Sequence, residues 1–69
     1  MNKTGRILAL ATELQTGKYV LVKEHRDKYR LSESTAHRDF KYVIYYLNTL
    51  GVSVKMGRDM DKNVRYWSE

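Results

Sequence analysis

Apolar residues recur at helical spacing in two segments of the chain. The first segment predicts a helix from about Thr4 to Gln15, with Asn2 or Thr4 as its N-cap. The second predicts a helix that begins after Ser32 and ends at Gly51. The apolar stripes consist of Ile7, Leu10, Ala11 and Leu14 in the first helix, and of Ala36, Phe40, Val43, Leu47 and Leu50 in the second.

A short, highly charged helix is expected between these two, from about Lys23 to Tyr29. His25 lies on its inner side, where a leucine would be ordinary, and we expect a partly buried histidine whose hydrogen bonds are satisfied. The chain must then turn sharply at Arg30. Ser32 offers a hydroxyl to cap the next helix, and Glu33 suits the positive end of its dipole. The predicted order is helix, turn, helix.

Three further segments have the composition of β-strands. Tyr19–Val22 is β-prone but too short to form a sheet alone, so it needs a partner strand from elsewhere. Val52–Lys55 and Val64–Trp67 flank a polar turn from Met56 to Asn63 and predict a β-hairpin. Three helices followed by a hairpin form the winged helix-turn-helix arrangement. We therefore predict an α+β fold, mainly α, in which residues 1–69 form a single winged helix-turn-helix domain.

Composition narrows the class of partner. The 69 residues include 13 Lys and Arg against 8 Asp and Glu, and the net charge of +5 favours a polyanion such as nucleic acid. There is no cysteine, which excludes disulfides and thiolate metal sites. No apolar run approaches the roughly 20 residues of a membrane span, and the N-terminus lacks a signal-peptide pattern. We expect a cytoplasmic protein that does not contact membranes.

The outer side of the helix after Ser32 carries chemistry suited to DNA. Arg38 can donate two hydrogen bonds to the O6 and N7 atoms of guanine, and Lys41 suits a phosphate. The hydroxyls of Ser34 and Thr35 can bond phosphate or base edges. The alternative is the ordinary solvated face of a basic protein, but the preceding helix and turn favour DNA binding. At about 100° per residue, the positions opposite the apolar stripe are Ser34, Arg38, Lys41 and Tyr45, with Thr35, His37 and Tyr42 on the shoulders.

The predicted hairpin adds a second basic element. Its cations are Lys55, Arg58, Lys62 and Arg65. We consider Arg58 and Lys62 candidates for contacts with the DNA backbone or the minor groove. Asp59 and Asp61 stand beside them and would repel phosphate, so a solvated turn of mixed charge is the open alternative.

The sequence predicts no catalytic, metal or cofactor site. The triplet that begins at His37 matches the kinase catalytic loop, but the chain is far too short for a kinase and has no glycine-rich phosphate loop. Asp59, Asp61 and Asn63 have the spacing of a calcium loop, but Val64 stands where that loop needs glycine. We therefore expect that the protein is not an enzyme and binds no cofactor and no metal.

Asp39 lies at the edge of the apolar stripe, where a carboxylate is unusual. We hypothesise that it pairs with Arg6 on the first helix. Such a pair would lock the candidate DNA-binding helix in place.

Three stretches of the chain form a family pattern. They are Arg6-Ile7-Leu8, Leu14-Gln15-x-Gly17-Lys18-Tyr19-Val20 and Leu31-Ser32-x-Ser34-Thr35-x-x-Arg38-Asp39-Phe40. Together they resemble the N-terminal winged-helix domain of DeoR-type bacterial transcription regulators, and of the related repressors that carry a WYL domain. In that family the matching helix recognises DNA. The resemblance implies base or phosphate contacts for Ser34, Thr35, His37 and Arg38.

The chain departs from that family pattern at several points. His25 occupies a usual leucine position, Arg30 replaces a turn glycine, and the helix before Gly51 is about one turn longer. The tyrosines of that longer helix could serve a dimer contact. The family's ligand-sensing domain has no counterpart in this sequence, so we expect no small-molecule effector.

These observations predict a small stand-alone transcription regulator, such as a repressor, that binds duplex DNA sequence-specifically as a dimer or in cooperative arrays. Its size would suit a phage or another mobile element. Two alternatives stay open. One is an excisionase-like architectural protein that bends DNA. The other is a winged-helix protein–protein interaction module whose adhesive surface consists of Tyr42, Tyr45, Tyr46 and Trp67.

Overall fold

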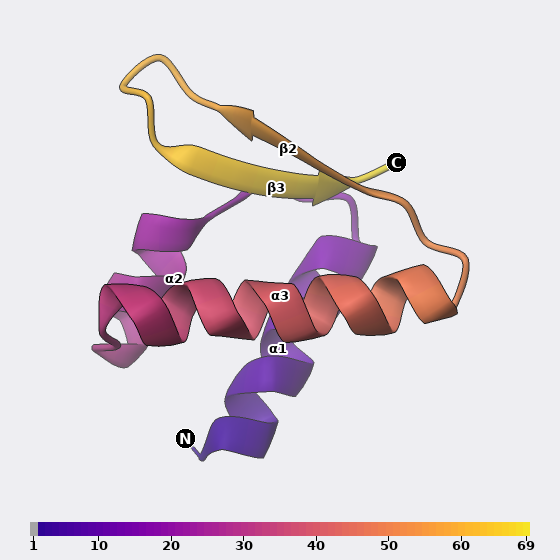
Figure 1. Ribbon diagram of the computed structural model, residues 1–69, viewed down its shortest axis with the longest axis horizontal. Coiled ribbons are helices and arrows are strands. Elements are labelled where there is room, and N and C mark those ends of the chain that lie inside the picture. The colour runs from indigo at the N-terminus through magenta and orange to yellow at the C-terminus, as the bar shows by residue number, and fades with distance from the viewer. Residues whose placement is uncertain (1) are drawn as a thin grey trace.

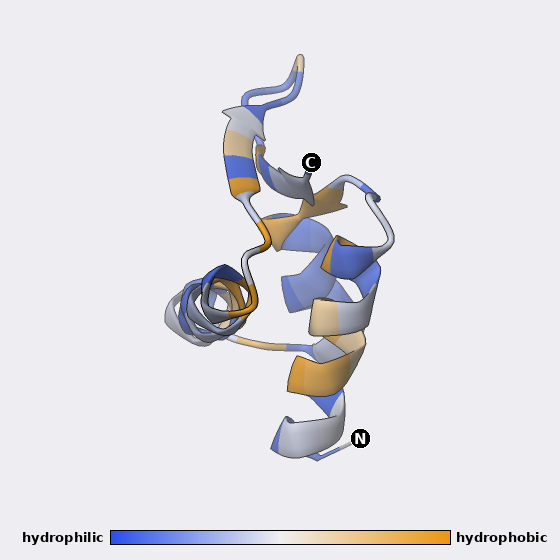
Figure 2. Ribbon diagram, turned by 90° about the vertical axis from the view of Figure 1, so that its right-hand side faces the viewer, coloured by the Kyte–Doolittle hydropathy of each residue, from blue (hydrophilic) through white to orange (hydrophobic). Residues whose placement is uncertain are grey.

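The computed structural model describes residues 2–69, which fold into three helices and a three-stranded antiparallel sheet (Figure 1). The elements are α1 (Lys3–Gln15), β1 (Val20–Leu21), α2 (Val22–Tyr29), α3 (Glu33–Thr49), β2 (Val54–Arg58) and β3 (Val64–Ser68). The sheet packs on the helices as a second layer, and its hairpin extends beyond them (Figure 2). This is the α+β winged-helix architecture that the hydrophobic pattern predicts.

Both long helices begin where a side-chain cap satisfies a free backbone N–H group. The side-chain oxygen of Asn2 accepts a hydrogen bond from the N–H of Gly5 at 2.8 Å. The hydroxyl of Ser32 accepts one from the N–H of Thr35 at 3.2 Å. α3 ends where Gly51 adopts a φ of +82°, which glycine does without strain. Local signals in the sequence therefore set the limits of these two helices.

β3 is the central strand of the sheet and pairs with β1 on one side and β2 on the other. Tyr66 of β3 lies opposite Val20 of β1 and opposite Met56 of β2. The short β1 thus finds its partner strand in the C-terminal hairpin, as its length requires. Because β1 leads directly into α2, this pairing fastens the hairpin to the helices.

The element boundaries differ from the prediction chiefly at β1 and β2. Val22 begins α2 instead of ending β1. β2 spans Val54–Arg58 rather than Val52–Lys55, because Met56 continues the pairing with β3 opposite Tyr66. Polarity alone suggested a longer turn, but strand pairing is a backbone interaction that exposed side chains tolerate.

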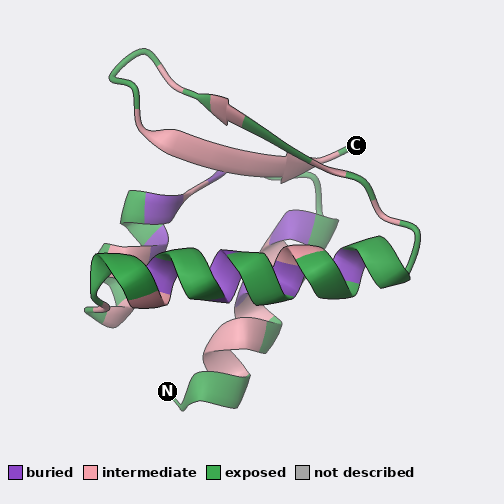
Figure 3. Cartoon of the chain, in the orientation of Figure 1, coloured by how far each residue is buried: buried purple, intermediate pink, exposed green. Residues whose placement is uncertain are grey.

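The core lies between α1, α3 and the sheet (Figure 3). Phe40 of α3 is 1% exposed and stacks on Tyr66 of β3, with ring centroids 4.9 Å apart. Burial of one such side chain contributes roughly 1.5–3 kcal/mol. Leu50 was wrongly assigned to this stripe: it is 54% exposed, because α3 has ended and the chain leaves the core there. The buried apolar residues are Leu10, Ala11, Leu14, Val20, Val22, Ala36, Phe40, Val43 and Leu47.

A buried carboxylate joins the three helices. Asp39 of α3 is 1% exposed, and its two oxygens accept hydrogen bonds from Nε and Nη2 of Arg6 on α1 at 2.6 and 3.0 Å. Its Oδ2 also lies 2.8 Å from Nε2 of the buried His25 on α2. Because an ionised carboxylate carries no hydrogen, Nε2 of His25 is the donor. The hypothesis of an Arg6–Asp39 pair is confirmed, and His25 is a further partner that it did not include.

The contacts of Asp39 keep it ionised. Burial by itself raises the pKa of this carboxyl, because it penalises the charged form. The hydrogen bonds from Arg6 and His25 outweigh that effect, so the pKa of Asp39 lies below its ordinary value. The carboxylate is therefore charged at neutral pH and binds Arg6 as an ion pair.

Arg30 makes the turn between α2 and α3 in the left-handed conformation, with φ 54° and ψ 48°. The N–H of Leu31 then reaches back to the carbonyl of Arg26 at 2.8 Å and closes the end of α2. A residue with a Cβ atom is less stable in this conformation by roughly 1–2 kcal/mol. The turn is imposed by the two helices that it joins.

The Arg6–Asp39 pair should show strong coupling at neutral pH. Arg6→Ala should destabilise the domain by about 3 kcal/mol, because it leaves a buried charge short of its main partner, and combination with Asp39→Ala should cost far less than the sum. The folded-state pKa of Asp39 lies below the unfolded value of about 3.9, so the coupling should be complete above that pH and vanish as pH falls through the folded-state pKa. Urea denaturation of the four proteins at a series of pH values measures it. Additive losses at pH 7 would contradict the pairing.

Arg30→Gly should stabilise the domain by about 0.5–1 kcal/mol. Glycine removes the strain of the left-handed conformation, and this gain exceeds the cost of the greater conformational entropy that glycine gives the unfolded chain. Arg30→Ala keeps the Cβ atom and is the matched control, which should not be stabilised. The midpoint of urea denaturation reports both changes. A lower midpoint for Arg30→Gly than for Arg30→Ala would show that the turn stores no strain, because only the entropy cost of glycine would then remain.

Candidate nucleic-acid interface

The outer face of α3 is exposed along the length of the helix (Figure 3). The exposed residues on its mid-line are Ser34, Arg38, Lys41 and Tyr45, opposite the buried stripe. In the part of the chain that the structure describes, neither Arg38 nor Lys41 forms an ion pair. Both cations are therefore open to an anion from solvent.

Hydroxyl groups gather at the start of α3. The hydroxyl of Ser32 donates to that of Thr35 at 2.9 Å and lies 3.3 Å from that of Ser34. Thr35 is partly buried, whereas Ser34 is exposed. Thr35 is thus partly committed to the helix cap, and Ser34 presents its hydroxyl to solvent at the positive end of the helix dipole.

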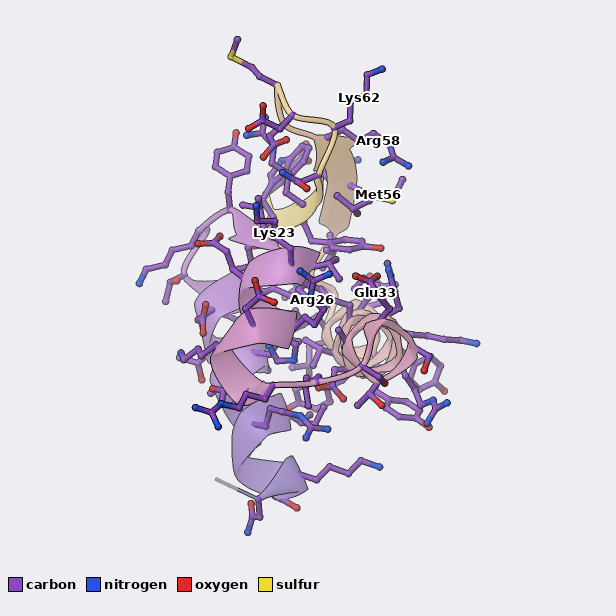
Figure 4. The ribbon with its side chains drawn as sticks, turned by 90° about the vertical axis from the view of Figure 1, so that its left-hand side faces the viewer. Lys23, Arg26, Glu33, Met56, Arg58 and Lys62 are labelled. Carbon is purple, nitrogen blue, oxygen red and sulfur yellow. The ribbon has the colours of Figure 1, made fainter. Side chains whose placement is uncertain are left out.

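An ionic chain crosses from α2 to the start of α3. Arg26 bonds to Glu33, and Figure 4 shows the two side chains pointing toward one another. Glu33 also lies 3.4 Å from Nε2 of His37, one turn further along α3. Arg26 is paired with Asp27 as well, at 2.9 Å. His37 is therefore drawn to the flank of α3 by a carboxylate.

The sequence pattern did not lead us to predict this ionic chain. The spacing of four residues between Glu33 and His37 is a signal for their contact on one helix. Nothing local pairs Arg26 with Glu33, because they belong to different helices and meet only after α2 and α3 have packed.

The tip of the hairpin is a short, internally bonded turn. The carboxylate of Asp59 accepts hydrogen bonds from the backbone N–H groups of Asp61 and Asn63, both at 2.9 Å. Lys62 adopts a φ of 65°, and its N–H reaches the carbonyl of Asp59 at 3.0 Å. This is a three-residue loop with a left-handed last residue. The backbone N–H of Asn63 is the largest cause of a lowered pKa at Asp59.

Arg58 and Lys62 flank this turn. One guanidinium nitrogen of Arg58 donates to the carbonyl of Lys62 at 2.9 Å, so the two candidates stand at the same tip. Figure 4 shows Met56, Arg58 and Lys62 projecting toward the side of the molecule on which α3 lies. The hairpin tip and the outer face of α3 therefore present cations to one side. Asp59 stands between Arg58 and Lys62, and its carboxylate is bonded to backbone N–H groups of the turn.

Two residues of the predicted hairpin surface lie elsewhere. The guanidinium of Arg65 is 4.5 Å from the ring of Tyr19 and 5.8 Å from that of Trp67. Trp67 itself is partly buried and packs over Gly57, where an added Cβ would approach its ring to 3.0 Å. Arg65 was thus wrongly grouped with the cations of the tip, and Trp67 with the freely exposed aromatics. Strand pairing puts both on the opposite face of the sheet from Tyr66 and Met56.

Tyr42 lies away from the other candidate DNA-binding residues of α3. Its ring faces α1, where Nζ of Lys3 lies 5.6 Å from its centroid, and it borders hollows lined by Ile7 and Leu8. Of the predicted residues, the structure brings together Ser34, Thr35, His37, Arg38 and Lys41 on α3, with Arg58 and Lys62 at the hairpin tip. Tyr42 belongs to the other shoulder of α3.

Residues 2–69 contain neither a metal-binding cluster nor a membrane-spanning helix. No group of three or more His, Asp or Glu side chains could hold a metal ion there. None of the helices in this range combines the length and apolarity that crossing a membrane requires.

Comparisons of the chain with protein-family models, with curated proteins and with solved structures found no match. The resemblance to DeoR-type domains therefore stays a prediction. Function is inferred below from the geometry of α3 and the hairpin.

Asp59→Ala should loosen the hairpin tip, because it removes the acceptor of two backbone N–H groups. Asp59→Asn keeps one side-chain oxygen and is the matched control. Amide hydrogen exchange at Asp61 and Asn63 should become faster in the alanine variant and stay near wild type in the asparagine variant. Unchanged exchange in Asp59→Ala would mean that the main-chain bonds suffice to hold the turn.

Proposed function

We propose that the chain binds duplex DNA sequence-specifically as a regulator of transcription, with α3 in the major groove. The observation that supports this most is the exposed line of Ser34, Arg38 and Lys41 on the outer face of a helix in a winged-helix fold. A hydroxyl, a guanidinium and an ammonium are the groups that bond base edges and phosphates. The proposed role is binding, without catalysis.

The individual roles follow from the chemistry of each group. Arg38 carries a planar fork that matches O6 and N7 of guanine, so it is the proposed determinant of sequence. Lys41 and Ser34 suit phosphate contacts that fix the orientation of α3. His37 is held near Glu33, so it is suited to the edge of the interface.

The hairpin tip supports the proposal as a second contact. Arg58 and Lys62 stand together there and project to the same side as α3 (Figure 4). A rigid tip loses less conformational entropy on binding than a flexible tip does. We propose that it follows the DNA backbone beside the groove that α3 occupies.

An architectural function is the second candidate. Met60 is fully exposed at the hairpin tip, between the two cations. Methionine is among the apolar side chains that insert between base steps and kink a duplex. Strong bending of bound DNA that Met60→Ser abolishes would favour this candidate over a regulator that only occupies its site.

The test begins with duplexes that the wild-type protein selects from a random-sequence pool. Arg38→Ala should lose about 1–3 kcal/mol of binding free energy at a selected site and relax the preference at one base pair. Lys28→Ala is the matched control, because it also removes one cation but from a side chain paired with Glu13. The wild-type affinity should weaken steeply with salt.

Binding that does not depend on salt would contradict the proposal. So would equal losses for Arg38→Ala and Lys28→Ala, since only the first lies on the outer face of α3. Both variants should denature like the wild type, because both side chains are exposed.

A further inference from the structure

An apolar groove runs between α1 and α3 on the shoulder that carries Tyr42. In Figure 1 the N-terminal half of α1 lies below α3, on the side away from the hairpin, and the helix then passes behind α3. Leu8, Tyr42 and Tyr46 rim the groove and are 61%, 50% and 52% exposed. The groove is lined by Ile7, Leu8 and Ala11 of α1 and by Tyr42, Val43 and Tyr46 of α3.

The groove carries little charge in a strongly basic chain. The segment from Tyr42 to Leu50 contains no Lys, Arg, Asp or Glu, and the net charge of the chain is +5. Lys3 borders only the adjoining hollow near the start of α1, where it lies over the ring of Tyr42. A surface for DNA or for an acidic protein would present cations here, and a surface for a basic protein would present carboxylates.

A face with little charge allows two copies of a basic chain to associate. Like charges brought together across an interface cost free energy, so self-association is favoured where the chain carries few charges. We infer that the groove is the contact between two copies of this chain, related by a two-fold axis. In such an interface Leu8 and Tyr46 of one copy pack into the groove of its partner, and the reverse contact repeats them.

The position of the groove suits the proposed DNA-binding function, on which this inference rests. The groove lies on one shoulder of α3, and the outer face with Arg38 lies beside it. A two-fold axis through the groove, perpendicular to the exposed face in Figure 1, turns both α3 helices to the same side. The domain measures 31 × 30 × 18 Å, and the half-sites that a dimer binds are one duplex turn of about 34 Å apart.

The size of the groove implies a weak dimer. Tyr42 and Tyr46 each expose about half of a side chain that buries roughly 150–250 Å² when covered, and Leu8 adds a similar exposed area. The apolar patch is thus on the order of 300 Å², whereas a stable interface buries about 800 Å² per partner. In free solution the dimer should therefore form at high protein concentration, and at lower concentration on a duplex whose two half-sites hold both copies together.

Sedimentation equilibrium of the purified chain without DNA tests the contact directly. The weight-average mass should rise from 8.2 kDa toward twice that value as the concentration approaches about 1 mM. Tyr46→Ala and Leu8→Lys should weaken the association at least about tenfold. Tyr45→Ala is the matched control: it removes a neighbouring exposed tyrosine from the same helix but outside the groove, and should leave the association within about twofold.

A second measurement separates this inference from the proposed function. On a selected duplex with two half-sites, Leu8→Lys should abolish cooperative binding but keep the affinity for one half-site, because it adds a cation away from α3's outer face. Intact self-association without DNA affinity would overturn the proposed function alone. Salt-dependent DNA binding by a chain that stays monomeric at every concentration would overturn the dimer contact alone. Equal weakening by Tyr45→Ala and Tyr46→Ala would also overturn it.

Discussion

The contact between Arg6 and Asp39 is the constraint on which the outer surface of α3 depends. A buried carboxylate is tolerated only when cations and donors surround it, and here they come from two other helices, α1 and α2. α3 can therefore adopt a single rotation about its axis. Asp39 and Phe40 point inward in that rotation, so their neighbours Arg38 and Lys41 point outward. The ion pair thus contributes to stability and also orients the residues proposed to bind DNA.

The fold pairs some cations of the chain with other groups and leaves others exposed to solvent. Arg6 is paired with Asp39, and Arg26 is paired with two carboxylates. Arg65 lies against the rings of Tyr19 and Trp67. A net charge of +5 therefore says little about where a polyanion would bind, since several cations face inward or are neutralised. The cations on the outer face of α3 and at the hairpin tip remain open to solvent. This distribution, more than the total charge, supports the proposed interface.

α3 has three distinct faces, which explains how so small a domain can combine stability with two surfaces for partners. Its inner stripe fills the core, and its outer mid-line carries the polar and basic groups. The shoulder toward α1 is apolar and carries little charge. The last turn of α3 carries Tyr46 onto that shoulder, so the length of α3 extends the groove. DNA binding and self-association would then use neighbouring faces of one helix without competing.

The sequence by itself determined the helices, the hairpin and the outward line from Ser34 to Lys41, because caps and periodic stripes act within a few residues of one another. It also implied the Arg6–Asp39 pair, since a carboxylate among apolar positions requires a cation. Only the tertiary structure decided that His25 shares this carboxylate, that Glu33 pairs with Arg26, and that Arg65 turns away from the hairpin tip. It also decided that Tyr42 borders a groove with α1. These contacts join residues on separate elements, and no local pattern encodes the distance between elements before they have packed.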